Sequence, residues 1–217
     1  MGKEREPEQG ELPYRFRGGK RDGAGRKPKG ERAGVSHLAR SHVNGREPVH
    51  VGLRLQRGLP DLQRRKAFAA VEKAFEAAAA RRDDFRVTHY SVQGNHLHLI
   101  VEAENGSALS RGMQGLCIRL ARAINRLAKR TGKVFADRFW SRLLKTPREV
   151  RHAIAYVLGN SRKHAERMGL WITLPAADPF AAGPGQDRPG LEAPRTWLLR
   201  VGWTRAPAPR AALDVPF

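Results

Sequence analysis

The sequence has one cysteine, Cys117, among its 217 residues. A disulfide framework and a cysteine-rich zinc site are therefore both excluded. No apolar run approaches the roughly 18–20 residues that a membrane-spanning helix needs. The first residues are polar and predict no secretory signal. We expect a cytoplasmic protein that does not enter a membrane, with one domain of ordinary size flanked by tails.

Acidic residues are scarce relative to basic ones: 21 Asp and Glu stand against 41 Lys and Arg, a net charge of +20. Such a surface favours a polyanion as partner, and nucleic acid is the common case. An anionic membrane is disfavoured because no segment is both basic and strongly amphipathic with bulky aromatics on its apolar face. A GC-rich genome, which raises Ala, Gly, Arg and Pro together, is the alternative source of the arginines.

Both ends of the chain lack a hydrophobic period. Residues 1–47 are rich in Gly, Pro, Arg, Lys and Glu, and we interpret them as a flexible basic arm. Within the arm, the segment around Arg26 and Lys27 resembles the short arms that lie in a DNA minor groove; a solvated basic tail is the alternative. Residues 171–217 form a Pro-rich extension, whose Trp-containing cluster at 197–203 is expected to dock on the domain.

The middle of the chain, residues 48–170, carries the periodic signals. Alternation and β-branched residues predict strands, apolar residues at three- and four-residue steps predict helices, and a Thr-Pro-x-Glu start suggests a capped last helix. The order β-α-β-β-α-β-α indicates an α+β fold, a split βαβ (ferredoxin-like or RRM-like) antiparallel sheet with helices on one face. The expected strands cover 49–55, 85–93, 96–103 and 134–144, and the expected helices cover 62–82, 107–130 and 146–164.

Two histidines share one face of the third predicted strand. His96 and His98 are two residues apart and point the same way, whereas Leu97 and Leu99 point toward the core. Two imidazoles that converge on one point can hold a divalent metal. On spacing alone, two surface histidines are the alternative, because His-x-His often occurs by chance. Any ion needs a further ligand from another element.

The last predicted helix carries a polar line. Tyr156 and Asn160 lie four residues apart and therefore on one face, and His152 and His164 continue the line; an exposed helix face is the alternative. A metal on the sheet can polarise a phosphoryl oxygen, and a tyrosine oxygen can attack phosphorus to give a covalent phosphotyrosine. Tyr90, in the second strand near the histidines, is a competing nucleophile.

These residues carry a resemblance to a known family. Residues 95–100 (NHLHLI) resemble the His-hydrophobic-His motif of the HUH endonuclease superfamily, and residues 156–160 (YVLGN) resemble its catalytic helix. Residues 135–141 (FADRFWS) are similar to the segment before that helix in single-tyrosine members. The match is to the transposases of the smallest insertion sequences and to REP-associated tyrosine transposases, and it covers roughly residues 48–165.

The resemblance implies a site, a cofactor and a substrate. His96, His98 and Asn160 would bind a divalent ion, Mg²⁺ or Mn²⁺, and Tyr156 would cut single-stranded DNA and stay joined to the 5′ phosphate. These proteins bind imperfect hairpins, so a basic flank is expected; residues 111–170 hold 15 Lys and Arg against 3 Asp and Glu, a net +12. The resemblance does not decide whether the oligomeric state is a monomer or a homodimer. Phosphate contacts are assigned to Arg119, Arg122, Arg126, Arg138 and Arg142.

One departure and two other functions stay open. After Asn160 the chain reads Ser-Arg-Lys-His at 161–164, where many REP-associated members have Asn-Pro-Val. This difference leaves the subgroup and the hairpin preference open.

A protein with the same sheet but no catalytic activity is the second hypothesis; it would bind single strands or hairpins of DNA or RNA, as some RNA-binding sheets do. A replication initiator or relaxase of the same superfamily is the third reading, disfavoured by chain length and by the single tyrosine at this motif.

Overall fold

The computed structural model describes Val35, residues 42–160 and residues 178–207. The predicted DNA-arm residues Arg26 and Lys27 lie outside the described residues, as does His164. The last helix, expected over 146–164, ends within the described residues at Leu158, with Gly159 as its C-cap. Among the residues that are described, no helix is long and apolar enough to cross a bilayer.

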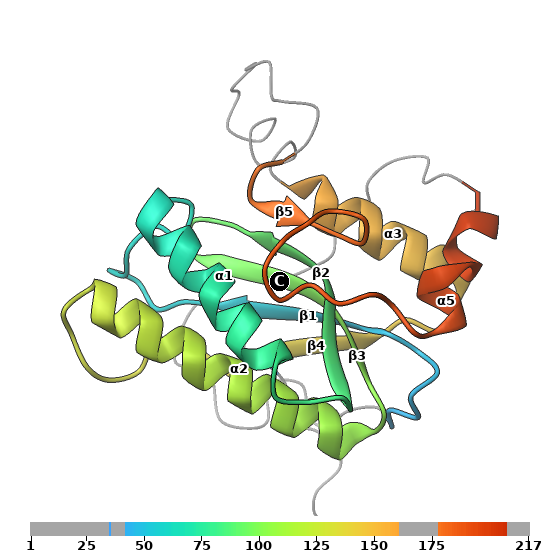
Figure 1. Ribbon diagram of the computed structural model, residues 1–217, viewed down its shortest axis with the longest axis horizontal. Coiled ribbons are helices and arrows are strands. Elements are labelled where there is room, and N and C mark those ends of the chain that lie inside the picture. The colour runs from blue at the N-terminus through green and yellow to red at the C-terminus, as the bar shows by residue number, and fades with distance from the viewer. Residues whose placement is uncertain (1–34, 36–41, 161–177, 208–217) are drawn as a thin grey trace, which may run out of the picture. The chain divides into compact units, whose positions relative to one another are not determined.

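The centre of the fold is a five-stranded sheet in the order β4-β1-β3-β2-β5, with every neighbouring pair antiparallel (Figure 1). The first three strands lie where alternation predicts them. The α+β class and the split βαβ sheet are confirmed, because β1 and β3 are the inner pair, α1 connects β1 to β2, and α2 connects β3 to β4. The strands are β1 (Val49–Arg54), β2 (Phe85–Val92), β3 (His96–Ala103), β4 (Trp140–Leu143) and β5 (Ala181–Ala182).

Two helices, α1 (Arg65–Ala79) and α2 (Gly106–Leu127), lie side by side on one face of the sheet (Figure 1). Each buries a stripe at helical spacing against alternate strand residues, as an amphipathic helix does. The side chain of Asn105 caps α2 by accepting a hydrogen bond from the backbone N–H of Ala108. The shared core includes Val51, Leu53, Leu97, Leu99, Val71, Phe75, Leu116 and Leu120.

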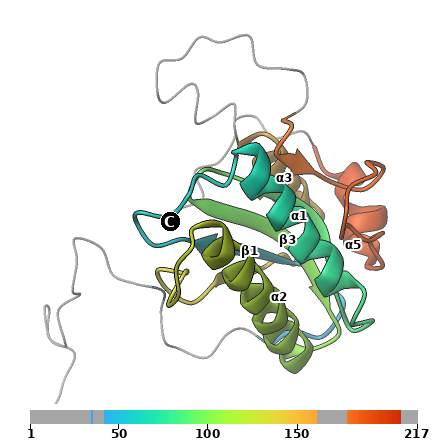
Figure 2. The same cartoon turned by 60° about the vertical axis from the view of Figure 1, so that its left-hand side comes forward.

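A third helix, α3 (Pro147–Leu158), departs from the prediction that the helices share one face. Ile100 of β3 belongs to a second buried cluster with Val150 and Val157 of α3, whereas its neighbour Leu99 belongs to the α1–α2 core. Helix α3 therefore packs on the opposite face of the sheet. The short helix α5 (Trp197–Arg200) and the 3₁₀ turn Gly202–Arg205 contact α3, and Figure 2 shows α3 beside α5.

The fourth strand is shorter than the expected 134–144. Regular pairing is confined to β4, and Phe135 makes only an isolated bridge to Leu55. Between them, the carboxylate of Asp137 accepts hydrogen bonds from the backbone N–H groups of Val35 and Arg138. A side chain that satisfies nearby backbone in this way competes with a strand ladder, so the chain turns where hydropathy suggested continuous strand.

The described part of the C-terminal extension packs on this domain. Strand β5 pairs with β2 and adds an edge strand to the sheet. Leu198 and Leu199 are buried in the cluster around α3, as the apolar pattern predicted, whereas Trp197 is 51% exposed. The carboxylate of Glu102 on β3 accepts hydrogen bonds at 2.8 Å from the backbone N–H groups of Arg195 and Thr196, so a buried charge fastens the extension to the central sheet.

Candidate active site

His98 and Tyr156 meet on the face of the sheet that α3 covers. His98 alternates with Leu97 and Leu99 along β3 and is fully buried. The phenol oxygen of Tyr156 lies 3.4 Å from Nε2 of His98, and the two rings are perpendicular with centroids 4.9 Å apart. The structure thus brings together the strand and the helix that the sequence analysis singled out.

Helix α3 is placed by strong local signals. Thr146 and Glu149 form a capping box, in which each side chain hydrogen-bonds the other residue's backbone N–H, and Pro147 occupies the first turn. The apolar stripe with Val150 and Val157 then packs against Ile100 of the sheet. This packing fixes the rotation of α3 about its axis. Because Tyr156 precedes Val157 directly, its side chain is directed along the sheet surface toward the histidines.

His96 stands at the start of β3 beside His98. Its ring is perpendicular to that of His98 with centroids 5.2 Å apart. Its Nδ1 lies 2.9 Å from Oδ1 of Asn95, an atom that only accepts hydrogen bonds, so Nδ1 carries the proton. The ring nitrogen that His96 can present to a metal is therefore Nε2, held in orientation by a hydrogen bond from the other nitrogen.

Asn160 lies four residues after Tyr156, beyond the C-cap Gly159 at which α3 ends, and is 2% exposed. Its amide nitrogen is buried and has no hydrogen-bond partner among the described residues. A buried amide N–H group without a partner is costly; this nitrogen only donates, so the atom that would ligate a cation is the amide oxygen. Of the ligands expected for a metal, His96 and His98 are thus in mutual contact, whereas Asn160 lies past the end of α3 and its approach to the histidines stays a prediction.

This donor set fits a divalent metal. Two imidazole nitrogens and one amide oxygen are ligands that Mn²⁺ accepts, and the amide oxygen also suits Mg²⁺. Within the described ranges, no group of three or more His, Cys, Asp or Glu side chains is arranged to hold a metal. The amide oxygen of Asn160 as third ligand to the histidine pair stays a prediction.

A third histidine, His50 of β1, completes the cluster and was missed by the sequence analysis. Its Nε2 lies 3.3 Å from Nδ1 of His98, and its ring contacts Tyr156 and Trp140 edge-on. Burial, and to a lesser extent the Arg142 guanidinium, lowers the pKa of His50 from 6.5 to about 4, so the ring is neutral at pH 7. The available signal was the alternation that puts His50 on the opposite face from Val49 and Val51.

The competing nucleophile Tyr90 faces the other way. It is fully buried in the α1–α2 core, and its hydroxyl donates a hydrogen bond to Oε1 of Glu72 on α1 at 3.2 Å. Burial, and secondarily the negative charge of Glu72, raises the pKa of Tyr90. Tyr90 therefore lies across the sheet from His98, with a hydroxyl that resists ionisation.

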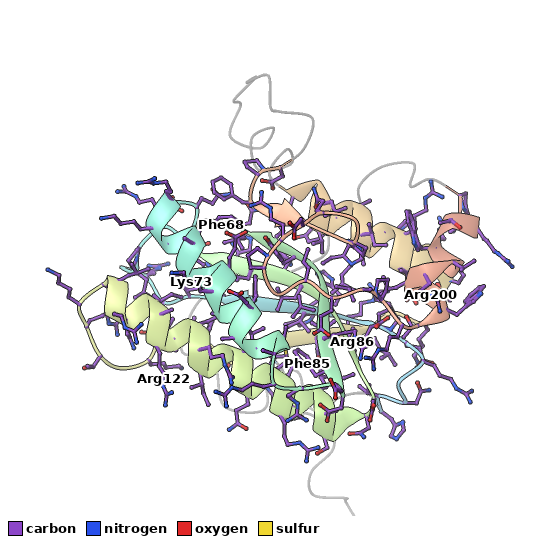
Figure 3. The ribbon with its side chains drawn as sticks, in the orientation of Figure 1. Phe68, Lys73, Phe85, Arg86, Arg122 and Arg200 are labelled. Carbon is purple, nitrogen blue, oxygen red and sulfur yellow. The ribbon has the colours of Figure 1, made fainter. Side chains whose placement is uncertain are left out.

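The arginines assigned to phosphate fall on two faces. Arg119, Arg122 and Arg126 belong to α2, which covers the face opposite Tyr156; Figure 3 shows Arg122 there. Arg142 on β4 pairs directly with His50 in the strand register, so its side chain is on the Tyr156 face. It is about half exposed and forms a 2.9 Å ion pair with Glu149. Arg138 is half-buried in the segment before β4.

Comparison with solved structures supports the fold. The structure of a REP-associated tyrosine transposase bound to a REP hairpin superposes with a TM-score of 0.54 and 18% identity, over 68% of this chain and 82% of the other. A bacterial tRNA(His) guanylyltransferase (Thg1)-like protein in complex with GTP gives a TM-score of 0.43 and 12% identity, over 61% and 73%, a level at which likeness carries no argument. A comparison of the sequence with protein-family models and with curated proteins finds no match. At the level of the fold, this chain is similar to that REP-associated tyrosine transposase.

Proposed function

We propose that this protein is a metal-dependent single-tyrosine transposase, which cleaves single-stranded DNA and transfers the strand through a 5′-phosphotyrosine intermediate. The observation that supports this most is the 3.4 Å approach of Tyr156 Oη to Nε2 of His98. A nucleophile and a candidate metal ligand are then able to act on the same phosphate. The likeness of the fold to a REP-associated tyrosine transposase supports the same assignment.

In the proposed cleavage step, Tyr156 Oη bonds to phosphorus and releases its proton to solvent. The bond from phosphorus to the 3′ oxygen breaks, and that oxygen takes up a proton to become a 3′ hydroxyl. The 5′ phosphate remains on Tyr156 as a phosphodiester. Transfer is the reverse with a new 3′ hydroxyl, and the phenol is regenerated because its aryl oxide is an acceptable leaving group.

His96, His98 and Asn160 would hold Mg²⁺ or Mn²⁺. When bound, such an ion polarises a phosphoryl oxygen and offsets the charge that develops on it. Arg142 adds positive charge on the same face of the sheet. The packing of α3 on the sheet holds Tyr156 in place, so the nucleophile loses little further conformational entropy when DNA binds.

The proposed substrate is single-stranded DNA that carries a hairpin. The net charge of +20 favours a nucleic-acid partner, and the solved structural relative is bound to a REP hairpin. The imidazoles and phenol on the α3 face favour chemistry over simple binding, because stacking platforms for single strands present exposed aromatic rings instead.

The test is capture of the covalent adduct. Purified protein is incubated with 5′- or 3′-labelled hairpin-bearing single-stranded DNA and Mn²⁺, and the products are separated on a denaturing protein gel. We expect label to remain on the protein only when it is 3′ of the cut, and Tyr156→Phe to abolish the adduct while DNA affinity is retained.

His96→Ala and His98→Ala separate the metal from the nucleophile. Both variants, and the wild type in EDTA, should bind DNA but form no adduct. An adduct that persists at full yield in Tyr156→Phe would refute the nucleophile, and one that persists in EDTA would refute the metal. Binding with no adduct under any condition would favour the binding-only function.

A further inference from the structure

His50 reaches His98 because of the strand register. In the β1–β3 pair, His50 lies opposite Ile100 and Gly52 lies opposite His98. Gly52 has no side chain, so the diagonal neighbour on the same face, His50, is able to approach the His98 imidazole. The ring centroids are 5.4 Å apart, and the closest nitrogens are Nε2 of His50 and Nδ1 of His98.

The His50 ring is held rigidly in this position. It is 2% exposed, and rings from two other elements pack on it edge-on: Trp140 of β4 at 5.3 Å and Tyr156 of α3 at 5.7 Å between centroids. A buried side chain that is packed from several elements has little rotational freedom. The hydrogen bond to His98 therefore has a fixed direction, which is what a group that orients a neighbouring ring requires.

The contacts on the two nitrogens of His98 determine which one can carry a proton. Nδ1 faces His50 at 3.3 Å, and Nε2 faces the Tyr156 hydroxyl at 3.4 Å. A neutral imidazole has one N–H and one lone pair. If Nδ1–H donates to His50, the lone pair is on Nε2 and points toward Tyr156; the opposite arrangement puts a proton on Nε2, which cannot then ligate a metal.

We propose that His50 is a positioning residue, which accepts a hydrogen bond from Nδ1–H of His98 and thereby keeps the lone pair of His98 on Nε2, facing Tyr156. This inference rests on the proposed function in giving His98 a metal to bind, but the hydrogen bond itself exists without metal or DNA. His50 acts through His98 and makes no contact with substrate.

The first experiment reads the tautomer directly. Two-bond ¹H–¹⁵N correlation spectra of the ¹⁵N-labelled protein, without metal or DNA at pH 7.5, report which nitrogen of His98 is protonated. We expect the Nδ1–H form in the wild type and a mixture of tautomers in His50→Phe, which keeps a ring but has no acceptor. His89→Phe is the matched control, because His89 is also a buried histidine of the sheet, lies beside Thr88 rather than His98, and should leave the His98 signals unchanged.

The second experiment measures Mn²⁺ affinity by electron paramagnetic resonance on the same proteins. Loss of an orienting partner typically weakens metal binding 10–100-fold, so we expect a weakening of that size in His50→Phe and none in His89→Phe. His50→Gln offers an amide oxygen as acceptor and should recover most of the affinity, which a purely space-filling role would not predict.

The outcomes separate the inference from the proposed function. An Nε2–H tautomer of His98 in the wild type, or unchanged Mn²⁺ affinity in a folded His50→Phe protein, overturns the role of His50 even if DNA cleavage is found. If the wild type binds no Mn²⁺ and forms no adduct, the proposed function fails, whereas a His98 tautomer that depends on His50 still supports the positioning contact.

Discussion

Tyr156 Oη and His98 Nε2 are 3.4 Å apart although the residues are separated by 58 positions in the chain. The contact forms because α3 crosses the sheet face that α1 and α2 leave uncovered, with Ile100 as the point of packing. A residue that is two positions from His98 thus anchors the helix that carries the tyrosine. The packing core and the candidate chemistry share one surface, so the geometry of the site depends directly on the stability of the α3–sheet cluster.

The choice of nucleophile predicts the behaviour of Tyr90→Phe. Its hydroxyl bonds Glu72 in the α1–α2 core, across the sheet from the histidines. We expect the variant to form the covalent DNA adduct at the wild-type yield. Its free energy of unfolding in urea should fall by about 1 kcal/mol for the lost hydrogen bond. The loss stays small because Arg188 also contacts Glu72, at 3.2 Å. Absence of the adduct in a folded Tyr90→Phe protein would contradict the assignment to Tyr156.

Arginines on opposite faces of the sheet should have different effects on DNA binding and on the rate of adduct formation. Arg142 lies beside His50 on the Tyr156 face, whereas Arg126 lies on α2 across the sheet. In single-turnover reactions at saturating protein, Arg142→Ala should slow adduct formation about tenfold, less than the loss of a buried charge-stabilising donor because the side chain is exposed. Arg126→Ala should leave that rate unchanged.

The same pair of variants can be compared in equilibrium DNA binding. For each phosphate contact that is lost, the slope of log affinity against log salt becomes shallower by about 0.7 on single strands or 0.9 on duplex. We expect Arg126→Ala to show this change, because an α2 contact would bind DNA away from the scissile phosphate. A slower adduct rate in Arg126→Ala with an unchanged salt slope would be the opposite of this expectation.

Most of the candidate site could be predicted because its signals are local. The two-residue spacing of His96 and His98 puts both on one face of β3, and the capping signals locate the helix that carries Tyr156, whereas Asn160 lies beyond the end of that helix. The sequence did not identify His50 as a site residue, because a single histidine in an apolar strand has no local pattern that distinguishes it from a packed core residue. Its role depends on the β1–β3 register and on Gly52 opposite His98, and register is a property of paired strands rather than of either sequence.

Most of the secondary structure could be predicted from the sequence, but the face of the sheet that each helix covers could not, because packing decides it. Periodicity located β1, β2, β3 and the stripes of α1 and α2, but the stripe of α3 is compatible with either face of the sheet. Ile100, one residue from the α1–α2 core position Leu99, settles that choice only in three dimensions. The short length of β4 could not be predicted for another reason. The side chain of Asp137 accepts hydrogen bonds from neighbouring backbone N–H groups, and hydropathy does not reveal that these bonds compete with strand pairing.

Glu102→Ala should release the C-terminal extension. The carboxylate holds the backbone of Arg195 and Thr196 and lies 3.8 Å from Arg86, with both charged side chains about 5% exposed. Removing it takes the nearest counter-charge from the buried Arg86 guanidinium, while Glu192 still acts on that charge. We therefore expect a loss of about 3 kcal/mol in the free energy of unfolding, at the lower end for a broken buried pair. Limited proteolysis should cut within residues 178–207 faster than in the wild type. Glu104→Ala, an exposed glutamate two positions away, should change stability by less than about 0.5 kcal/mol.

Two buried histidines make stability depend on pH. Burial lowers the pKa of His89 from 6.5 to about 4, and His50 is lowered to about 4 as well. Between pH 4 and 6.5 the unfolded chain binds protons that the folded protein does not. The two histidines therefore make their full contribution to the free energy of unfolding above pH 6.5, and this contribution falls as the pH drops toward 4. Each histidine accounts for up to about 3 kcal/mol across that range.

Urea unfolding at pH 7.5, 6.0 and 5.0 measures this dependence, and His89→Phe isolates one of the two groups. The variant loses the contact between His89 and Thr88, so its stability at pH 7.5 can differ from that of the wild type. Its stability should nevertheless fall less between pH 7.5 and 5.0, because one of the two titrating rings is gone. An equally steep fall in His89→Phe would mean that His89 has the same pKa in the folded and unfolded states, since only a pKa difference between them couples a group to stability.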